Sequence, residues 1–428
     1  LAAGPYVMLK DSLGALPINY WVYPSAVQDA LRSFQRTPEI IAFFNREYGY
    51  DYPWVKYDQI TIPGIGGGAE STSATVVGQN TIHDERAEQD FPSHWLVAHE
   101  AAHQWWGDLV TMRTWSHTWI NESFATYGEY LYSKHLYGEE EGALNLEDKK
   151  NAYLREARER YQRPIVFDRY VFPNENFDSH TYPKGAALLH TLRWLMGDAP
   201  FQRALSHFLH KHAFQAVDTF ELMTAIKEAT GQNMDWFFEQ WIFKAGHPIF
   251  EVSYTWDESA KQLQLNVLQT QQASDWIPIF KTPVQIGVTT LEGKTIHKLW
   301  LDKKEERFEL ECATKPLLVR FDEGNFLLKE LAFKKSAEEL LYQLMHDDVV
   351  GRMWAANELK GFADRAKVIA ALRASAQTDS FWAVRRSAVE ALGSLQRAEH
   401  AAFLKKKCAD PKSRVRVAAL KALGELKQ

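Results

Sequence analysis

The residues His99-Glu-Ala-Ala-His103 have the types and the spacing of a zinc site. Residues four apart on an α-helix lie on one face, so both imidazoles can reach one ion while Glu100 lies beside it. Zinc favours imidazole nitrogen, and a catalytic zinc site has three protein ligands and a water. A motif this short arises by chance in roughly a few per cent of long, histidine-rich chains. A third ligand is therefore needed before the motif predicts an enzyme.

Glu122 is the candidate third ligand. Eighteen residues separate it from His103, and it lies in Trp119-Ile-Asn-Glu-Ser-Phe-Ala125, at the predicted start of the next helix. Two antiparallel helices with such a linker can present this carboxylate to both histidines, which gives the His₂Glu set of zinc hydrolases. Glu100, which is not a ligand, is then placed to take a proton from a zinc-activated water and pass it to the leaving amine. The pattern predicts peptide hydrolysis with one zinc ion per chain and no covalent intermediate.

The elements that carry these residues are predicted to be helices. Asp90-Phe-Pro92 is a helix start and Gly107 a helix end, because proline is tolerated in the first turn and glycine favours the end of a helix. A second helix is predicted from near Asn121 to about Gly138. Before them, the spacing of apolar residues predicts a helix over Ala26 to Tyr48. Strands are predicted over Lys56 to Ile62 and Thr75 to Ile82.

The pattern changes after residue 246. Phe250-Glu-Val-Ser-Tyr-Thr-Trp256 and Leu263-Gln-Leu-Asn-Val267 alternate between apolar and polar residues, and Glu292-Gly293 occupies the place of a hairpin turn. Residues 247 to about 328 are therefore predicted to form a small antiparallel β domain.

The last hundred residues contain a repeat. Arg352-x-x-Ala355-x-x-x-Leu359 recurs from Arg385 and from Arg416, at offsets of 33 and 31 residues. An aspartate precedes each arginine by four to six residues: Asp348, Asp379 and Asp410. A helical unit of this length predicts stacked helix pairs that resemble HEAT-type repeats. An irregular helical domain is the alternative, because three units are few.

Composition excludes several classes. The formal net charge of −6 is too small to indicate nucleic-acid binding. No apolar run approaches the length of a membrane span, and the first residues lack the features of a signal peptide. The two cysteines, Cys312 and Cys408, make neither a disulfide framework nor a cysteine zinc site. The compartment stays open.

Taken together, these motifs resemble the gluzincin aminopeptidases of the alanyl aminopeptidase and leukotriene hydrolase family. The resemblance runs from about residue 1 to residue 330. Its most specific stretch is His99-Glu-Ala-Ala-His-Gln-Trp-Trp-Gly107, followed by Trp119-Ile-Asn-Glu-Ser-Phe-Ala125. The resemblance implies a zinc aminopeptidase that acts on peptides with a free amino terminus.

A second family motif, Tyr-x-Lys-Gly-Ala, is matched by Tyr182-Pro-Lys-Gly-Ala186, which Phe177-Asp178 precede. By this match Tyr182 is the hydroxyl that stabilises the tetrahedral oxyanion, and Asp178 is a supporting residue. Without the family, a Tyr-Pro pair would indicate only a turn or a core position.

A third family motif, Gly-x-Met-Glu-Asn, holds the substrate's free amino group. Its counterpart here is Gly67-Gly-Ala-Glu-Ser71, so the implied substrate-binding residues are Gly67, Gly68, Ala69 and Glu70. A carboxylate suits an α-ammonium group. Ala69 and Ser71 depart from the family pattern, and the smaller Ala69 is expected to enlarge the pocket for the first side chain. On their own, the glycines indicate a tight turn or a backbone close to a ligand.

The expected fold class is α+β and multi-domain. It consists of a thermolysin-like zinc peptidase catalytic domain over 1–246, a β-sandwich over 247–332 and a helical HEAT-like repeat domain over 333–428. Family members carry a further β domain before the catalytic one, and this chain starts where that domain would end. The expectation is therefore that the N-terminal β domain is missing, through processing or because a companion chain supplies it.

Two other functions are compatible with parts of this pattern. An endopeptidase could use the same zinc site, but Glu70 would block a chain that continues past it. A catalytically inactive scaffold should have lost a ligand, the base or the tyrosine. All five positions are intact: His99, Glu100, His103, Glu122 and Tyr182. Aminopeptidase activity is the stronger prediction.

Overall fold

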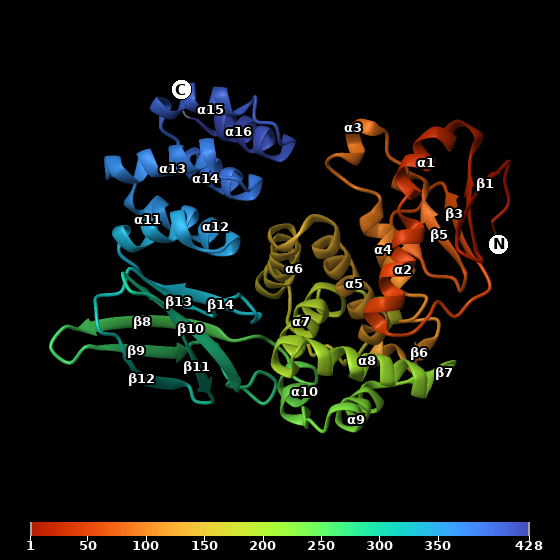
Figure 1. The fold of residues 1–428 in the computed structure, drawn as a ribbon, viewed down its shortest axis with the longest axis horizontal. Helices are drawn as coiled ribbons and strands as arrows, with labels where there is room; N and C mark the ends of the chain where they lie inside the picture. The colour runs from red at the N-terminus through yellow and green to blue at the C-terminus, as the bar shows by residue number, and fades with distance from the viewer. Residues whose placement is uncertain (1, 427–428) are drawn as a thin grey trace. The chain divides into compact units, whose positions relative to one another are not determined.

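The computed structural model describes residues 2–426, which divide into two compact units. The first comprises Leu1–Gly246 with Ala273–Pro278, and the second comprises His247–Gln272 with Ile279–Gln428. The fold is of mixed α+β type with a helical C-terminal region (Figure 1). The division into three domains at 246/247 and 332/333 stays a prediction. No helix within the described residues combines the length and the hydrophobicity needed to cross a membrane.

The first unit begins with a five-stranded sheet in the order β1-β2-β3-β5-β4. The strands are β1 (Val7–Leu13), β2 (Leu16–Val22), β3 (Tyr57–Ile62), β4 (Gly68–Ala69) and β5 (Ala74–Gly78). Strands β2, β3 and β5 are parallel to one another, and β1 and β4 pair antiparallel at the two edges. Alternate residues of β2 from Ile18 onward are buried, and the ring centroids of Tyr20 and Phe34, which lies in the first α-helix, are 5.3 Å apart.

Two predictions in this region are wrong in extent. Instead of one helix over Ala26 to Tyr48, the chain forms η1 (Pro24–Ala26), α1 (Val27–Phe34) and α2 (Thr37–Tyr48). The break is explained by Pro38 at the start of α2, because proline has no amide hydrogen with which to continue α1. The strand predicted to reach Ile82 ends at Gly78, where η2 (Gln79–Thr81) begins.

Helices make up most of the rest of the first unit. They are α3 (Glu85–Glu88), α4 (His94–Ala102), α5 (Trp119–Tyr137), α6 (Glu139–Glu159), α7 (Gly185–Met196), α8 (Asp198–His212), α9 (Thr219–Thr230) and α10 (Asp235–Trp241). It also contains a short parallel pair, β6 (Val110–Met112) and β7 (Gln215–Val217), and the short turns η3 (Trp115–His117), η4 (Pro173–Asn176) and η5 (His180–Lys184). Indole stacking joins α4 to α5: Trp106, just after α4, lies 3.9 Å from the ring of Phe124. This contact holds in place the two helices on which the metal ligands were predicted.

Helix α4 is shorter than the sequence predicts. It starts at His94 and ends at Ala102, with His103 as its C-cap. The amides of Gln104 and Trp105 bond to carbonyls three residues back, which tightens the last turn. Gly107, predicted as the helix end, has φ 134° and lies in the turn that leads away.

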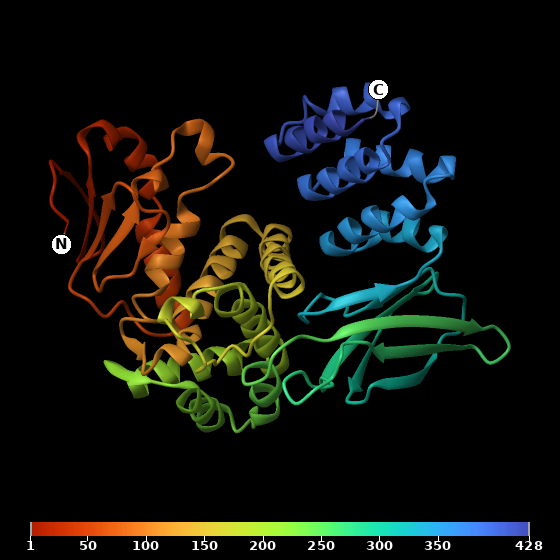
Figure 2. The same cartoon turned by 180° about the vertical axis from the view of Figure 1, so that it is seen from behind.

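The second unit begins with two small sheets (Figure 2). One has the order β11-β10-β13 and the other the order β12-β9-β8-β14. The strands are β8 (Ile249–Asp257), β9 (Gln262–Gln269), β10 (Thr282–Thr290), β11 (Gly293–Leu301), β12 (Glu305–Glu311), β13 (Leu318–Phe321) and β14 (Glu330–Phe333). Thr290 pairs with Gly293, so the predicted hairpin turn is present with Leu291 and Glu292 at its tip.

The helical end of this unit is a stack of helix pairs (Figures 1 and 2). Its helices are α11 (Ala337–His346), α12 (Val349–Glu358), α13 (Ala366–Thr378), α14 (Trp382–Ser394), α15 (Ala401–Lys407) and α16 (Ser413–Glu425), with η6 (Leu359–Phe362) and η7 (Ala398–His400) between them. The three repeated alanines, Ala355, Ala388 and Ala419, are fully buried, as expected where helices make close contact. The prediction of a helical repeat region is confirmed.

Candidate metal centre and peptide site

Three nitrogen and oxygen atoms converge between α4 and α5. His99 Nε2 and His103 Nε2 are 3.1 Å apart, and Glu122 Oε2 lies 3.4 Å from the first and 3.2 Å from the second. All three side chains are buried. Together they form a cluster with the donor types and the spacing of a metal site.

The hydrogen bonds behind the two rings fix which nitrogen carries the proton. His99 Nδ1 donates to Glu129 Oε1 at 2.7 Å, and His103 Nδ1 donates to the carbonyl of Trp106 at 2.8 Å. Carboxylate and carbonyl oxygens only accept, so in the neutral rings both Nε2 atoms carry lone pairs. Two lone pairs and the carboxylate of Glu122 then face one point, and Glu122 Oε2 has no hydrogen-bond partner among residues 2–426. A cation satisfies all three acceptors, and two imidazoles with one carboxylate fit zinc.

Glu129 was not predicted from the sequence. It lies on α5, seven residues after Glu122, and so on the same face two turns further along. Its second oxygen accepts from Lys149 of α6 at 2.6 Å, which holds the carboxylate against His99. The seven-residue spacing was the available signal, but an acidic residue on a long helix is usually only a solvated side chain.

Glu100 lies beside the metal cluster without joining it. Its side chain is buried, and Oε2 has no hydrogen-bond partner in the part of the chain that the structure describes. Burial raises the pKa of this carboxyl to about 7; the two histidines oppose the shift and the charge of Glu70 adds to it. A carboxyl with a pKa near neutrality can both accept and release a proton.

Strand β4 forms the wall next to Glu100. A Cβ built on Gly68 would lie 2.4 Å from the Glu100 carboxyl carbon, so only glycine fits. Gly67 before it has φ 75°, a conformation that glycine adopts without strain. The next two residues are Ala69 and Glu70. One carboxylate oxygen of Glu70, one of Glu100 and one ring nitrogen of His103 lie within 4.8 Å of one another.

Gln104 fixes the loop that carries Glu70. Its Nε2 donates to the carbonyl of Glu70 at 3.3 Å, and its Oε1 accepts from the amide of Ser73 at 2.8 Å. Because Gln104 directly follows His103, the metal helix and the predicted amine-binding loop are tied together. Sequence reasoning placed Gln104 in the family motif without a role.

Tyr182 approaches the cluster from a different segment. It lies in η5 (His180–Lys184), a π turn in which the amide of Lys184 bonds to the carbonyl of Ser179. Pro183 cannot donate, which favours this wider turn. The ring of Tyr182 is nearly parallel to that of His99, with centroids 6.1 Å apart. Burial and then the charge of Glu122 raise the pKa of Tyr182, so its hydroxyl keeps its proton and can donate it in a hydrogen bond.

The π turn is anchored to the helix of Glu122. Ser123 Oγ donates to the carbonyl of Thr181 at 2.5 Å. A Cβ on Gly185 would lie 1.8 Å from that same hydroxyl, so glycine allows the close approach of α7 to α5. The glycine of the Tyr-x-Lys-Gly-Ala motif therefore has a packing role.

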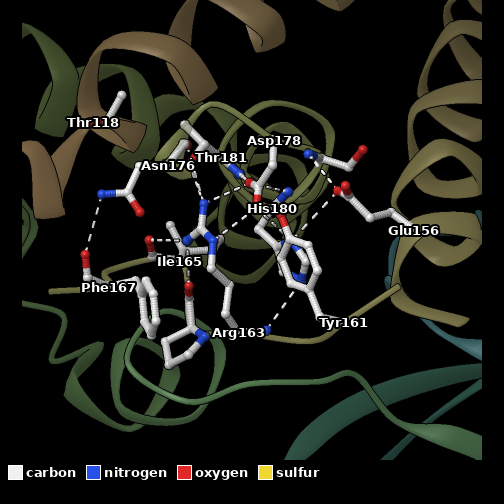
Figure 3. Close-up of polar contacts among 12 residues, drawn as sticks. Thr118, Glu156, Tyr161, Arg163, Ile165, Phe167, Asn176, Asp178, His180 and Thr181 are labelled. Atoms are coloured by element: carbon white, nitrogen blue, oxygen red, sulfur yellow. Dashed lines mark hydrogen bonds and ion pairs between the residues drawn. The ribbon is translucent and has the colours of Figure 1, made fainter. Parts of the chain in front are cut away.

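A buried arginine organises the residues before the π turn (Figure 3). Arg163 donates from Nε and Nη2 to the two oxygens of Asp178 at 2.9 and 2.6 Å, and from Nη2 to Thr181 Oγ1 at 2.9 Å. Asp178 Oδ1 in turn accepts from the amides of His180 and Thr181 at 2.9 and 3.1 Å. Burial alone would raise the pKa of Asp178, but the hydrogen bond from His180 and the charge of Arg163 hold it well below its usual value. Arg163 lies in a loop with no sequence pattern, so nothing in the sequence pointed to it.

The structure thus brings every predicted site residue into one region of the first unit. The ligands come from α4 and α5, the amine-binding residues from β4 and its loop, and the tyrosine from η5. A cavity of about 920 Å³ opens beside Tyr182, between Phe177, Arg169 and Trp276. Its lining includes Tyr182, Arg163 and Asp178, and none of the three candidate metal ligands.

Comparison with known proteins supports a family for this arrangement. Residues 32–241 match the peptidase family M1 domain, and residues 369–428 match HEAT repeats. This chain carries a peptidase family M1 domain.

Among curated relatives, the chain is similar to Aminopeptidase 2 of Candida albicans, with 28% identity over 65% of this chain and 31% of that protein. It is also similar to Aminopeptidase M1-A of Oryza sativa subsp. japonica, with 30% identity over 64% of this chain and 32% of that protein. The fold resembles the crystal structure of Legionella pneumophila aminopeptidase A in complex with aspartic acid, with a TM-score of 0.81, 17% identity and coverage of 98% of this chain and 56% of that one. The chain spans about a third of the length of the two sequence relatives. The M1 domain match includes the metal cluster, Glu100 and Tyr182.

Proposed function

We propose that this chain is the catalytic part of a zinc aminopeptidase that removes single residues from the amino end of peptides. The observation that carries the proposal is the convergence of His99 Nε2, His103 Nε2 and Glu122 Oε2, three buried acceptors within 3.1 to 3.4 Å of one another, beside the carboxyl group of Glu100. The match to the M1 domain supports aminopeptidase activity.

His99, His103 and Glu122 would hold the zinc ion. Zinc bound there would supply Lewis acidity toward the attacking water and the scissile carbonyl. The roles of Glu129 and the Trp106 carbonyl are to keep the two ring protons on Nδ1, so that Nε2 stays available.

Glu100 is the proposed general base. Its Oε2 takes a proton from the attacking water as the new carbon–oxygen bond forms. The same carboxyl then gives that proton to the nitrogen of the departing amine as the carbon–nitrogen bond breaks. The pKa of about 7 suits both steps near neutral pH.

Tyr182 is the proposed donor to the oxyanion. Its hydroxyl is neutral and its ring is held by the anchored π turn, so no reorganisation is needed when charge develops on the carbonyl oxygen. Such a donor stabilises the transition state more than the substrate.

Glu70 is the proposed anchor for the substrate's ammonium group. Its carboxylate lies near Glu100 and His103, so a bound α-ammonium would sit one residue away from the bond that is cut. The backbone of Gly68 and Ala69 lies along the edge of the sheet, where an extended peptide could pair with it.

The test uses the purified 428-residue protein, zinc analysis and a panel of aminoacyl fluorogenic substrates and short peptides. We expect one zinc per chain, release of single amino-terminal residues and no cleavage of acetylated peptides. Glu100→Ala should keep the metal and lose nearly all turnover, whereas His99→Ala should lose the metal. Equal cleavage of acetylated and free peptides would instead favour an endopeptidase, and a Glu100→Ala variant with normal turnover would contradict the proposed base.

A further inference from the structure

The cavity beside Tyr182 shares only that residue with the proposed reaction site. Residues 67–70, which are proposed to receive the amino end of a substrate, do not line it, and neither do the metal ligands. The first side chain of a substrate is expected beside Ala69, which is also absent from the lining. With Glu70 holding the amino end and Tyr182 facing the carbonyl of the bond to be cut, the chain beyond that bond continues on the Tyr182 side. The cavity is therefore placed to receive the part of a peptide that follows the cut.

The walls of this cavity are held by hydrogen bonds within the first unit. Tyr161 donates its hydroxyl to Asp178 Oδ2 at 2.9 Å (Figure 3). Trp276 lies in Ala273–Pro278, the segment that belongs to the first unit, and its carbonyl accepts from the amide of Ala245 at 2.9 Å. The amide of Trp276 donates to Ser274 Oγ at 3.2 Å. A wall fixed in this way needs little ordering when a ligand binds.

Three arginines line the cavity, and they differ in their partners. Arg163 and Arg160 are each paired with a carboxylate, at 2.6 and 2.9 Å. Arg169 instead lies over the indole ring of Trp276, with its guanidinium carbon 4.8 Å from the ring centroid. Within residues 2–426, no carboxylate pairs with Arg169. One of the three positive charges is therefore available to a ligand.

The position of Arg169 suits a carboxylate ligand. Its side chain is exposed, and Trp276 is 46% exposed. Stacking on the ring holds the plane of the guanidinium and leaves the N–H groups at its edge free to donate. That edge matches the two oxygens of a carboxylate. Glu175 also lines the cavity, but its Oε2 accepts from the amide of Val171 at 3.1 Å.

We propose that Arg169 binds a carboxylate carried by the part of the peptide that follows the cut bond, so that substrates with a negative charge there are preferred. The inference rests on the proposed aminopeptidase function. The free carboxyl end of a short peptide and the side chain of an aspartate or glutamate present the same group. A substrate fits this cavity better than a permanently seated protein segment, because such a segment would lie against Tyr182, on which turnover is proposed to depend.

The first test measures binding without turnover. The zinc-loaded Glu100→Ala protein is titrated by calorimetry with the tripeptide Leu-Gly-Gly, either as the free acid or as its carboxyl-terminal amide. The acid should bind about ten-fold more tightly, as expected of a charge-assisted two-point pair. Adding Arg169→Gln should weaken binding of the acid to the level of the amide. Arg160→Gln is the matched control, because this arginine lines the same cavity but is already paired, and the ten-fold difference should persist.

The second test identifies the source of the carboxylate. Amidated tripeptides with aspartate or asparagine at the second or third position are compared in the same titration. A gain for aspartate that depends on Arg169 assigns the site to a side chain, whereas a gain confined to the free acid assigns it to the peptide end. Either result supports the proposal. Equal binding of all charged and neutral peptides would overturn it, and so would an equal loss for all of them in the Arg169 variant, which would indicate a structural role.

Turnover by the unmodified protein separates this inference from the proposed function. The acid and the amide are compared by kcat/KM, and the acid should be favoured about ten-fold. Release of the first residue from both peptides at equal kcat/KM would overturn the role of Arg169 and leave the aminopeptidase function standing. An acid–amide difference in binding without cleavage of any peptide would contradict the proposed function alone.

Discussion

The backbone of Gly68 lies directly against the carboxyl group of Glu100. A Cβ at that position would approach the Glu100 carboxyl carbon to 2.4 Å and its Oε1 to the same distance. Strand β4 and helix α4 are therefore in contact through the one side chain that is proposed to move a proton. The loop that is proposed to bind the substrate's ammonium group and the proposed base cannot shift independently.

Gly68→Ala should displace Glu100 and lower kcat by about 10²-fold, because misplacement of a reacting group by about 1 Å costs that much. Zinc content should not change, since none of the ligands contacts Gly68. Gly66→Ala is the matched control, because a Cβ there meets no atom of the described residues within 4 Å. Steady-state kinetics with an aminoacyl arylamide and zinc analysis check the prediction. Normal kcat in the Gly68 variant would mean that Glu100 adjusts freely and is not held for catalysis.

Glu129→Gln should weaken zinc binding by about 10–100-fold, because the charge behind His99 makes its Nε2 a stronger donor to the metal. At saturating zinc, kcat should stay close to that of the unmodified protein. Zinc competition with a fluorescent chelator gives the affinity. Glu159→Gln, an exposed glutamate of α6, serves as the control. Unaltered zinc affinity in the Glu129 variant would show that the hydrogen bond to His99 only positions the ring.

Asp178→Asn should act through Tyr182. Tyr182→Phe is expected to lower kcat by roughly 10²–10³-fold with little effect on KM. Asp178→Asn weakens the pairing with Arg163 that orders the π turn and should lower kcat by about ten-fold with intact zinc. The double variant should be no slower than Tyr182→Phe alone, because both changes remove the same contribution, that of the Tyr182 hydroxyl. If the kcat losses of the two single variants multiply in the double variant, Asp178 does not act through Tyr182.

Removal of the metal should destabilise the first unit. Without an ion, three buried acceptors face one another, and binding to the folded state alone adds about 2.7 kcal/mol of stability at a hundred-fold excess over Kd. A chelator should therefore lower Tm, and added zinc should restore it. Glu122→Ala should show a much smaller response to either treatment. A chelator-insensitive Tm in the unmodified protein would argue against a bound structural or catalytic ion at these residues.

The sequence predicted the parts of the site that depend on local spacing. Two histidines four residues apart on a helix must share a face, and this held even though α4 ends at Ala102 and His103 is only its cap. The repeat alanines were likewise predictable, because the same small residue recurs wherever helices meet closely. Periodicity within one element was sufficient in both cases.

Contacts between distant segments were not predictable in this way. Arg163 reaches Asp178 across a loop of irregular conformation, and no period marks it. The role of Gly68 depends on where β4 lies relative to α4, which is a property of tertiary packing. The helix predicted over Ala26 to Tyr48 failed because the apolar spacing continues through Pro38, whereas the backbone hydrogen bonds do not.

Because Tyr182 lies in the π turn His180–Lys184, the direction in which its side chain points depends on the number of residues in that turn. Each residue in a helical turn rotates the next side chain by about 100°, and this turn holds one residue more than an α turn. A substitution between Asp178 and Gly185 leaves that count intact, but a deletion or insertion of one residue would rotate the hydroxyl away from the metal cluster. In alignments of active relatives, gaps should therefore be missing from this segment even where its side chains vary.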